Sequence, residues 1–240
     1  MKRSVFYDRG ERCYTGIPGF DELCQGGFVR NSVNSILGGP GAGKSTFLLQ
    51  FLWNGVINYN ENGLFVSFEP LIDDVFNDAM SFGWNFFDLD SNGKCKFIKM
   101  SPKTNIRVIK QELMKLISRY DIKRICIDPV SVFSMYIDNE LSAREYLFEL
   151  VSLLKRLKVT VLISDETVDG TAENFNLSNE ENRTESIKYL CDGFINLYLA
   201  GLGGETDRAI RIIKMRRTSH ERGPVPFRIT NNGILISVRR

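Results

Sequence analysis

The chain has 240 residues, of which 43% are hydrophobic and 25% are charged, and its formal net charge at pH 7 is +2. Such a length and composition fit one globular domain with a sizeable core, and we expect that domain to cover residues 1–240. The small net charge gives no overall signature of a protein that binds nucleic acid or an anionic membrane surface.

The cysteines and the lengths of the apolar runs indicate in which cellular environment the protein works. The five cysteines are scattered along the chain and form no Cys-x-x-Cys pair. This usage is typical of reduced thiols in a cytoplasmic protein. No apolar run reaches the length of about 18 residues that a spanning helix needs, so we expect no membrane insertion.

Strand-like runs alternate with helical patterns through the first two thirds of the chain. Strands are predicted at 32–37, 63–68, 95–100, 124–128 and 159–164. Helical patterns are predicted at 44–59, at 70–83 with Pro70 in the first turn, at 105–119 and at 140–157. This alternation indicates a mainly parallel sheet that is covered by helices.

The pattern changes after residue 164. Residues 165–186 are polar, acidic and long for a connection, so we expect a mobile loop with a functional role. Only strand-like runs follow, at 193–200, 208–216, 225–230 and 233–238, and Asn232-Gly233 predicts a hairpin turn between the last two. The predicted fold is therefore an α/β core with a C-terminal antiparallel β extension.

The sequence Gly-Gly-Pro-Gly-Ala-Gly-Lys-Ser-Thr, which begins at Gly38, contains the full phosphate-loop pattern Gly-x-x-x-x-Gly-Lys-Ser. In such a loop the backbone N–H groups surround phosphate oxygens, Lys44 reaches the β and γ phosphates, and the Ser45 hydroxyl joins the Mg²⁺ shell. A helix that begins at Lys44 adds the positive end of its dipole. The sequence therefore predicts a site for a nucleoside triphosphate with Mg²⁺. The predicted nucleotide-binding residues of this loop are Gly39, Pro40, Gly41, Ala42, Gly43, Lys44, Ser45 and Thr46.

Asp128 ends the apolar run Arg-Ile-Cys-Ile-Asp, as a Walker B aspartate does. At the C-terminal edge of the sheet it would hold the same Mg²⁺ ion as Ser45. The alternative is that Asp128 is a strand-end cap or a turn residue. Its position after the phosphate loop favours the metal-binding role.

Glu69 follows the strand-like run Gly-Leu-Phe-Val-Ser-Phe. If that strand lies beside the phosphate-loop strand, its carboxylate would lie near the γ-phosphate, where it could orient the attacking water or act as a general base. The equal alternative is a glutamate that opens the next helix, beside Pro70.

Several segments resemble the KaiC-type ATPases, a RecA-like, ring-forming branch of the P-loop NTPases. They occur in the family's order at 15–28, 38–55, 64–69, 79–84, 124–128, 160–164 and 213–236. The last segment contains Lys-x-Arg-x-x-x-His, a spacing that is specific to the family. With one such domain, the chain is similar to the single-domain homologues that are common in archaea. The resemblance implies a RecA-like core and an ATPase that converts ATP to ADP and phosphate.

The resemblance also implies that the nucleotide lies between neighbouring subunits of a hexameric ring. Lys214 and Arg216 would contact the phosphates of the next subunit, with Arg216 as the arginine finger. Ser81 would approach the adenine edge within its own subunit. Around the base and ribose would lie Met215, Thr218 and His220. From the residues alone, the alternative is a solvated basic strand edge, which discourages aggregation.

Three positions depart from the family's pattern. The family has two glutamates after Phe-Val-Ser-Phe, whereas this chain has Glu69-Pro70, so we expect hydrolysis to be slow. Arg217 replaces the Gly that follows the finger position, which removes backbone freedom and adds a bulky cation. Pro129 replaces a frequent Ser after Asp128. Nothing in the sequence supports a transfer of the family's autokinase activity.

These observations leave three functions open. The first is a ring-forming ATPase with slow turnover and a regulatory or signalling task. The second is a non-hydrolysing, ATP-dependent scaffold or switch, such as the KaiC-like component of the archaellum motor, on which a protein partner docks. The third is a RecA-like ring that binds DNA. The segment 165–186 disfavours DNA, because its acidic residues outnumber its single arginine and repel phosphates.

Overall fold

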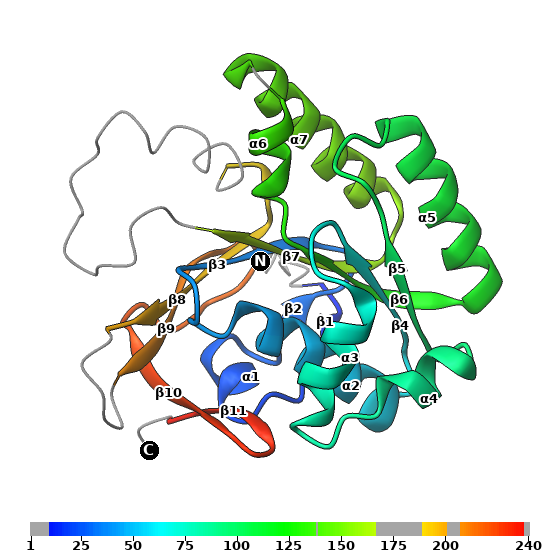
Figure 1. Cartoon of the computed structure of the whole chain (residues 1–240). Helices are drawn as coiled ribbons and strands as arrows, with labels where there is room; N and C mark the ends of the chain where they lie inside the picture. Colours follow the sequence, from blue (N-terminus) through cyan, green and yellow to red (C-terminus); the bar gives the residue numbers. More distant parts are fainter. Residues whose placement is uncertain (1–9, 138, 167–188, 201–206, 238–240) are drawn as a thin grey trace, which may run out of the picture.

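The computed structural model describes residues 10–137, 139–166, 189–200 and 207–237 (Figure 1). A small antiparallel pair is formed by β1 (Arg12–Cys13) and β2 (Phe28–Val29). The strands of the main sheet are β3 (Val33–Gly38), β4 (Asn62–Ser67), β5 (Cys95–Lys99), β6 (Ile122–Asp128), β7 (Thr160–Glu166), β8 (Gly193–Leu199), β9 (Arg208–Met215), β10 (Val225–Thr230) and β11 (Gly233–Ile236).

In the described residues the main sheet has nine strands, in the order β11-β10-β9-β8-β3-β7-β6-β4-β5. The six strands from β8 to β5 are parallel, whereas β9, β10 and β11 continue the sheet in antiparallel fashion. This arrangement confirms the predicted α/β core and its C-terminal antiparallel extension.

Helices cover both faces of the sheet. They are α1 (Phe20–Leu23), α2 (Lys44–Tyr59), α3 (Ile72–Met80), α4 (Phe86–Ser91), α5 (Ile106–Tyr120), α6 (Val132–Tyr136) and α7 (Glu140–Arg156). Figure 1 shows α1 to α4 on one face and α5 to α7 on the other. Each face buries its own hydrophobic cluster, so the parallel strands are apolar on both sides.

The central helix α2 follows from its sequence pattern. Its fully buried side chains, at three-to-four spacing, are Phe47, Leu48, Phe51 and Leu52. Gly43 before the helix and Asn60 after it both adopt left-handed backbone conformations, which begin and end the helix sharply. The predicted range 44–59 is confirmed.

The C-terminal hairpin is fastened to α2 by one side chain. The Gln50 carbonyl accepts a hydrogen bond from Ile234 N at 2.7 Å, and its amide donates to the Ile234 carbonyl at 3.3 Å. Gly233 lies beside this contact with a positive φ of 101°. The two-residue loop is Asn231-Asn232, so the predicted hairpin is correct but its turn lies one residue earlier than expected.

Other expectations need correction. The pair β1 and β2 and the helices α1, α4 and α6 are too short to give a periodic signal, and the sequence did not predict them. Helix α3 begins at Ile72, so Pro70 is outside it. The predicted loop 165–186 begins two residues too early, because Asp165 and Glu166 end β7, and its remainder is outside the described residues. No helix in the described part of the chain is long and apolar enough to span a membrane.

The strand that precedes Glu69 is not beside the phosphate-loop strand. The neighbours of β3 are β7 and β8, and β4 instead pairs with β5 and β6. The interpretation that these two strands are neighbours was therefore wrong. Crossover connections set the order of the strands within a parallel sheet, and no local sequence pattern indicates that order.

Replacement of Gly233 by Ala tests the contact between the hairpin and α2. A Cβ atom there would lie 2.6 Å from Trp84 Cζ2 and 2.7 Å from Gln50 Oε1. We expect Gly233→Ala to lower the free energy of unfolding by about 3 kcal/mol, from overpacking and backbone strain together. Gly83 is the matched control, because it also has a positive φ but no atom within 4 Å of an added Cβ. Gly83→Ala should cost only about 1 kcal/mol.

Urea unfolding monitored by circular dichroism measures both variants. Equal losses of stability for Gly233→Ala and Gly83→Ala would contradict the close packing of the hairpin on α2.

Candidate nucleotide-binding site

The phosphate loop connects β3 to α2, as predicted. Gly41 and Gly43 have φ values of 73° and 98°, which only glycine adopts without strain. A side chain on Gly38 would lie 2.6 Å from the Leu197 carbonyl oxygen, so this position also excludes one. Pro40 and Ser45 are exposed, whereas Ala42 is buried beneath the loop. The loop therefore presents backbone N–H groups and the start of a helix to solvent, which suits an anion.

Lys44 lies over this loop. Its ammonium group donates to the carbonyl oxygens of Gly38 at 2.8 Å and Gly39 at 3.1 Å. Only 8% of the residue is exposed, and its Nζ atom is 3.7 Å from a carboxylate oxygen of Glu166. The ammonium group is thus held at the loop, where a bound phosphate would add further acceptors.

Asp128 and Ser45 come together at the same edge of the sheet. The Ser45 hydroxyl donates to the Asp128 carboxylate at 2.7 Å, and the Ser164 hydroxyl donates to its other oxygen. Asp128 is 5% exposed, and Pro129 follows it through a cis peptide bond. A hydroxyl beside a carboxylate is a donor set that fits Mg²⁺, which prefers oxygen ligands.

This donor set is incomplete by itself. Among the described residues, no three His, Cys, Asp or Glu side chains form a group that could hold a metal ion. Magnesium usually keeps several waters and takes further oxygens from the substrate's phosphates. The pair of Ser45 and Asp128 therefore suits a magnesium ion that arrives with a nucleotide.

The end of β7 adds two carboxylates that sequence reasoning missed. β7 pairs with β3 so that Asp165 lies beside Leu37, and Glu166 beside Gly38. The signal was present as Asp-Glu directly after the predicted strand 159–164, but both residues were counted as part of the polar loop. Asp165 is 3% exposed, whereas the Glu166 side chain is 46% exposed.

Burial is the main cause of a raised pKa at the Asp165 carboxyl. It raises the pKa of this carboxyl from its ordinary value of 3.8 to about 7. A hydrogen bond from the Glu166 N–H and the nearby Lys44 act in the opposite direction, and the charge of Glu166 raises the pKa further. Asp165 is therefore a carboxyl that exchanges its proton near neutral pH.

Glu69 lies on the far side of Asp128. It is exposed, and its backbone carbonyl accepts a hydrogen bond from Lys99 at 3.1 Å. Because β7 and β6 separate β4 from β3, the ends of β4 and β3 are about 14 Å apart across the sheet. Glu69 is thus at the correct edge of the sheet but further from the loop than expected.

The segment from Lys214 to Arg216 lies at the opposite end of the sheet. Leu197 of β8 pairs with Gly38 on one side and with Ile210 on the other, which places Ile210 level with the phosphate loop. β9 then runs away from the loop, and Arg216 is about 20 Å further along the strand direction. These cations cannot reach the phosphate loop of their own chain.

Local contacts hold both cations in place. Lys214 donates to the Cys191 carbonyl at 2.8 Å, and burial followed by the nearby Arg216 lowers its pKa. Arg216 Nη1 is 3.6 Å from an Asp192 carboxylate oxygen, and the Arg216 side chain is 53% exposed. Met215 between them is buried. Arg216 is therefore the more accessible of the two cations.

Of the other predicted base and ribose residues, Thr218 and His220 follow Arg216 beyond the end of β9, and Ser81 follows α3. Thr218 accepts a hydrogen bond from Arg12 at 2.7 Å, and the His220 ring contacts the Glu221 carbonyl at 2.8 Å. Ser81 is exposed at the end of α3, where its hydroxyl donates to the Asp78 carbonyl at 2.7 Å. Their roles stay predictions.

Two arginines have unexpected positions. Arg217 has a φ of 59°, so it keeps the left-handed backbone for which a glycine is suited. Its carbonyl oxygen accepts a hydrogen bond from Arg12 at 3.2 Å. Arg208, which the sequence did not single out, donates to the Gly41 carbonyl at 3.5 Å and is a cation beside the phosphate loop of its own chain.

Comparisons with known proteins agree with this geometry. The model of the KaiC ATPase family matches residues 13–240. The circadian clock oscillator protein KaiC of Synechococcus elongatus is 32% identical over 232 residues, which cover 92% of this chain and 43% of that protein. A UPF0273 protein of Methanocaldococcus jannaschii is 32% identical over 243 residues, which cover 94% of this chain and 96% of that protein.

A solved structure is also similar. The crystal structure of a KaiC-like protein from the archaeon Pyrococcus horikoshii matches with a TM-score of 0.82 and 30% sequence identity, over 95% of this chain and 100% of that one. This chain spans less than half the length of the cyanobacterial KaiC proteins that it matches.

The ionisation of Asp165 predicts a dependence of stability on pH. Because its pKa is higher in the folded chain than in the unfolded chain, the folded state binds more protons, and stability falls as pH rises towards 7. We expect the free energy of unfolding to fall by about 2 kcal/mol between pH 5.5 and 8.5 from this residue alone. Asp165→Asn should remove that part of the loss, measured by urea unfolding at both pH values. The exposed Asp74→Asn is the control, and an equal effect there would contradict this origin of the loss.

The backbone of Arg217 predicts an unequal response to substitution. Arg217→Gly should leave the free energy of unfolding unchanged within about 0.5 kcal/mol. Glycine removes the strain of the left-handed backbone in the folded state, which stabilises the protein. This gain offsets the loss of the arginine contacts and the greater conformational entropy of glycine in the unfolded state. Arg217→Val should cost about 1–2 kcal/mol, because a β-branched residue resists a positive φ. Thermal unfolding of both variants measures the difference. Similar melting temperatures would mean that this turn relaxes to another conformation.

Proposed function

Because the chain belongs to the KaiC ATPase family, we propose that it is a cytoplasmic ATPase that binds ATP with Mg²⁺ and hydrolyses it slowly in a homo-oligomeric ring. Neighbouring copies share each nucleotide site, and the ring is a hexamer with a regulatory or signalling task that involves a protein partner. The contact between Ser45 and Asp128 at the mouth of an intact phosphate loop carries the proposal.

The residues around the loop have distinct tasks in this proposal. The backbone from Gly39 to Thr46 and the Lys44 ammonium bind the phosphates. Ser45 and Asp128 hold the magnesium ion, which neutralises phosphate charge when it is bound. Glu69 orients the attacking water, and its exposed position at the far side of Asp128 is consistent with a slow reaction.

The position of Arg216 supports a site that is shared between subunits. It is at the end of the sheet remote from its own phosphate loop, and more than half of its side chain is exposed. In a head-to-tail ring, that end of one copy faces the loop end of the next. Lys214 and Arg216 then contact the phosphates of the neighbour, while Met215, Thr218 and His220 surround its base and ribose. Ser81 approaches the adenine from within the neighbour itself.

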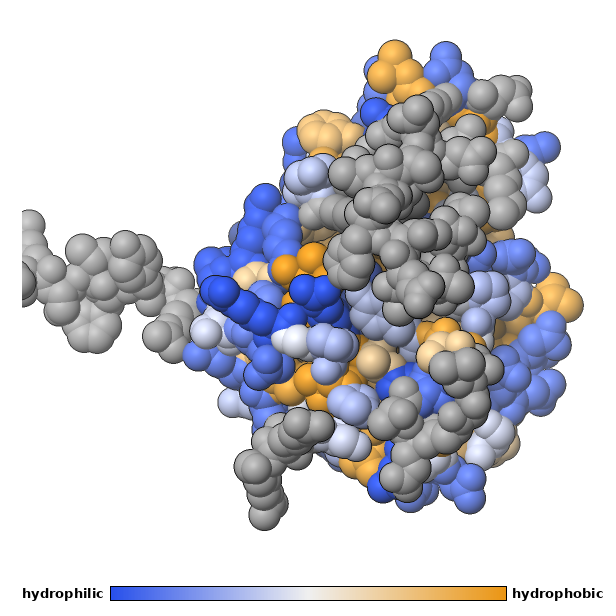
Figure 2. Space-filling view, turned by 90° about the vertical axis from the view of Figure 1, so that its left-hand side faces the viewer, coloured by the Kyte–Doolittle hydropathy of each residue, from blue (hydrophilic) through white to orange (hydrophobic). Residues whose placement is uncertain are grey.

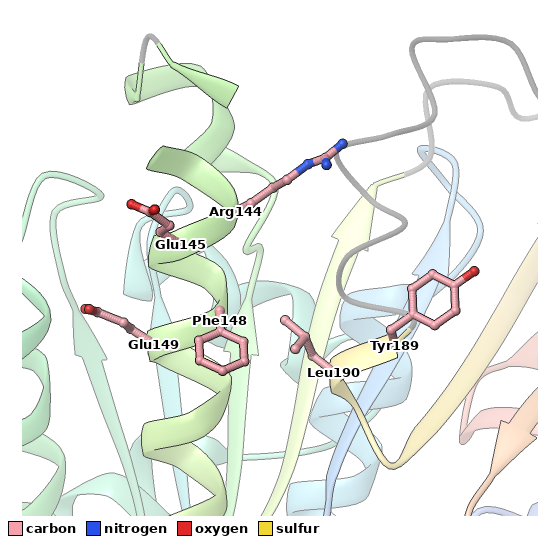
Figure 3. Close-up of a pocket in the computed structure, with 6 residues that line it drawn as sticks. All are labelled: Arg144, Glu145, Phe148, Glu149, Tyr189 and Leu190. Atoms are coloured by element: carbon pink, nitrogen blue, oxygen red, sulfur yellow. The ribbon is translucent and has the colours of Figure 1, made fainter. Parts of the chain in front are cut away.

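The surface near Lys214 also suits contact with a second copy. A groove of about 530 Å³ lies between α7 and the residues before β8, and Figure 3 shows Phe148 and Leu190 across from each other in it. Phe148 and Tyr189 are 56% and 73% exposed. The Tyr189 carbonyl accepts a hydrogen bond from Lys214 at 3.5 Å, so one residue that lines the groove contacts the proposed shared site.

The face at the left of Figure 1 is shown in Figure 2. Hydrophilic residues predominate on it, with hydrophobic areas between them. A mixed surface of this kind is common in interfaces between proteins that are stable as separate chains. It is consistent with an assembly of copies that are also stable separately.

A second function is favoured by specific residues. Glu69 is distant from the loop strand and is followed by Pro70, and Arg217 adds charge beside the finger position. A ring with these changes could bind ATP without hydrolysing it and act as a scaffold or switch on which a protein partner docks. The DNA-binding alternative depends on residues 165–186, most of which are outside the described residues, and their acidity disfavours it.

Mixing of two inactive variants tests the shared site. Lys44→Ala removes the phosphate lysine, and Arg216→Ala removes the proposed finger, so each variant alone should lose at least about 100-fold in ATP turnover. In a random equal mixture, about a quarter of the interfaces join an intact loop to an intact Arg216. Turnover should therefore recover to about a quarter of the wild-type value, measured as phosphate release at several protein concentrations.

Arg211→Ala is the control for Arg216, because Arg211 is on the same strand and binds the Arg222 carbonyl. It should leave turnover within about twofold of the wild type. An equal mixture that stays inactive, although size-exclusion chromatography shows mixed rings, would contradict a finger supplied by the neighbour. Tight ATP binding without any wild-type turnover would support the switch instead.

A further inference from the structure

Among the described residues, Glu166 is the carboxylate that forms an ion pair with the phosphate lysine. In the parallel pairing of β7 with β3, Glu166 lies directly beside Gly38, the first residue of the phosphate loop. Its Oε1 atom is 3.7 Å from Lys44 Nζ. Because Lys44 is the loop residue that reaches the β and γ phosphates, the Glu166 carboxylate lies next to the position of the terminal phosphate.

The environment of Glu166 suits contact with water. Its side chain is 46% exposed, so solvent reaches the carboxylate. Asp165, immediately before it, is buried, so its carboxyl group does not share this access to solvent. Lys44 is buried whereas the Glu166 end of the ion pair is half exposed, so the carboxylate can take further partners on its solvent side.

Glu166 and Glu69 lie on opposite sides of Asp128. The strand order β3-β7-β6-β4 places Glu166 next to the loop strand, Asp128 in the middle and Glu69 furthest away. A general base must lie within hydrogen-bond reach, directly or through one water, of the proton that it accepts. The accessible carboxylate at the end of the strand beside the loop strand is that of Glu166.

We infer that Glu166 is a second catalytic carboxylate at the γ-phosphate, opposite Glu69, and this inference rests on the proposed ATPase function. Glu69 orients the attacking water from one side, and Glu166 contacts this water from the other side and accepts its proton. The water oxygen forms a bond to the γ-phosphorus, and the bond from that phosphorus to the β–γ bridging oxygen breaks, with its electron pair leaving on ADP. Before the reaction, the negative charge of Glu166 also repels the γ-phosphate. Because ADP has no γ-phosphate, this repulsion weakens the binding of ATP more than that of ADP.

The test compares Glu166→Gln with the wild type in two measurements. Isothermal titration calorimetry with a non-hydrolysable ATP analogue and with ADP, both with Mg²⁺, measures affinity. We expect the analogue to bind about threefold to tenfold more tightly to Glu166→Gln, and ADP to bind within about twofold of the wild type. In steady-state kinetics, kcat should fall at least about tenfold while KM does not rise.

Glu112→Gln is the matched control. Glu112 is 39% exposed and 3.6 Å from Lys115, so it loses a similar ion pair on α5, away from the loop. It should change neither affinity nor kcat. Glu166→Asp, which keeps the charge, should restore the wild-type preference between the analogue and ADP, and Glu69→Gln combined with Glu166→Gln should lower kcat below either single variant.

Two failures are distinguishable. If Glu166→Gln leaves both the affinity for the analogue and kcat at wild-type values, the role of Glu166 is overturned while the ATPase proposal stands. If the wild type binds ATP but has no turnover, the proposed hydrolysis fails, and the inference about Glu166 as a catalytic residue fails with it. An unchanged preference for the analogue over ADP in Glu166→Gln would then also remove its proposed contact with the γ-phosphate.

Discussion

The pairing of β3 with β7 on one side and β8 on the other determines the geometry of the site. Hydrogen bonds fix Gly38 beside both Glu166 and Leu197, so the phosphate loop cannot shift along its neighbours without breaking both ladders. The same register places Arg216 at the other end of the sheet. One pattern of backbone pairing therefore places carboxylates beside the loop. The same pattern places Lys214 and Arg216, the cations of the Lys-x-Arg motif, away from it.

The loop edge of the sheet concentrates opposite charges in a small region. Lys44 is buried near Asp165 and Glu166, and Asp128 accepts a hydrogen bond from the next residue of the loop, Ser45. Each carboxyl meets a different environment, because Asp128 accepts two hydroxyl donors, Asp165 is desolvated and Glu166 is half exposed. Neighbouring acids with unequal surroundings can take separate chemical tasks within one site.

Local features of the site could be predicted from the sequence, and long-range ones could not. The phosphate loop, the range of α2 and the meeting of Ser45 with Asp128 depend on short motifs, and the structure has each of them. The neighbour of β3 depends on where a distant strand returns, so the carboxylate beside the loop was sought at Glu69 when Glu166 occupies that place. The positive φ of Arg217 could not be predicted either. A glycine at this position would indicate a left-handed backbone, whereas an arginine does not.

The two hydrogen bonds of Gln50 have a mechanical consequence. Gln50 is less than two turns from the start of α2, and its partner Ile234 belongs to a hairpin that is continuous, through β10, with β9. The helix that follows the phosphate loop and the first residues of β9 are thus linked through the hairpin. Any displacement of α2 relative to the sheet must therefore either carry the hairpin with it or break both hydrogen bonds of Gln50.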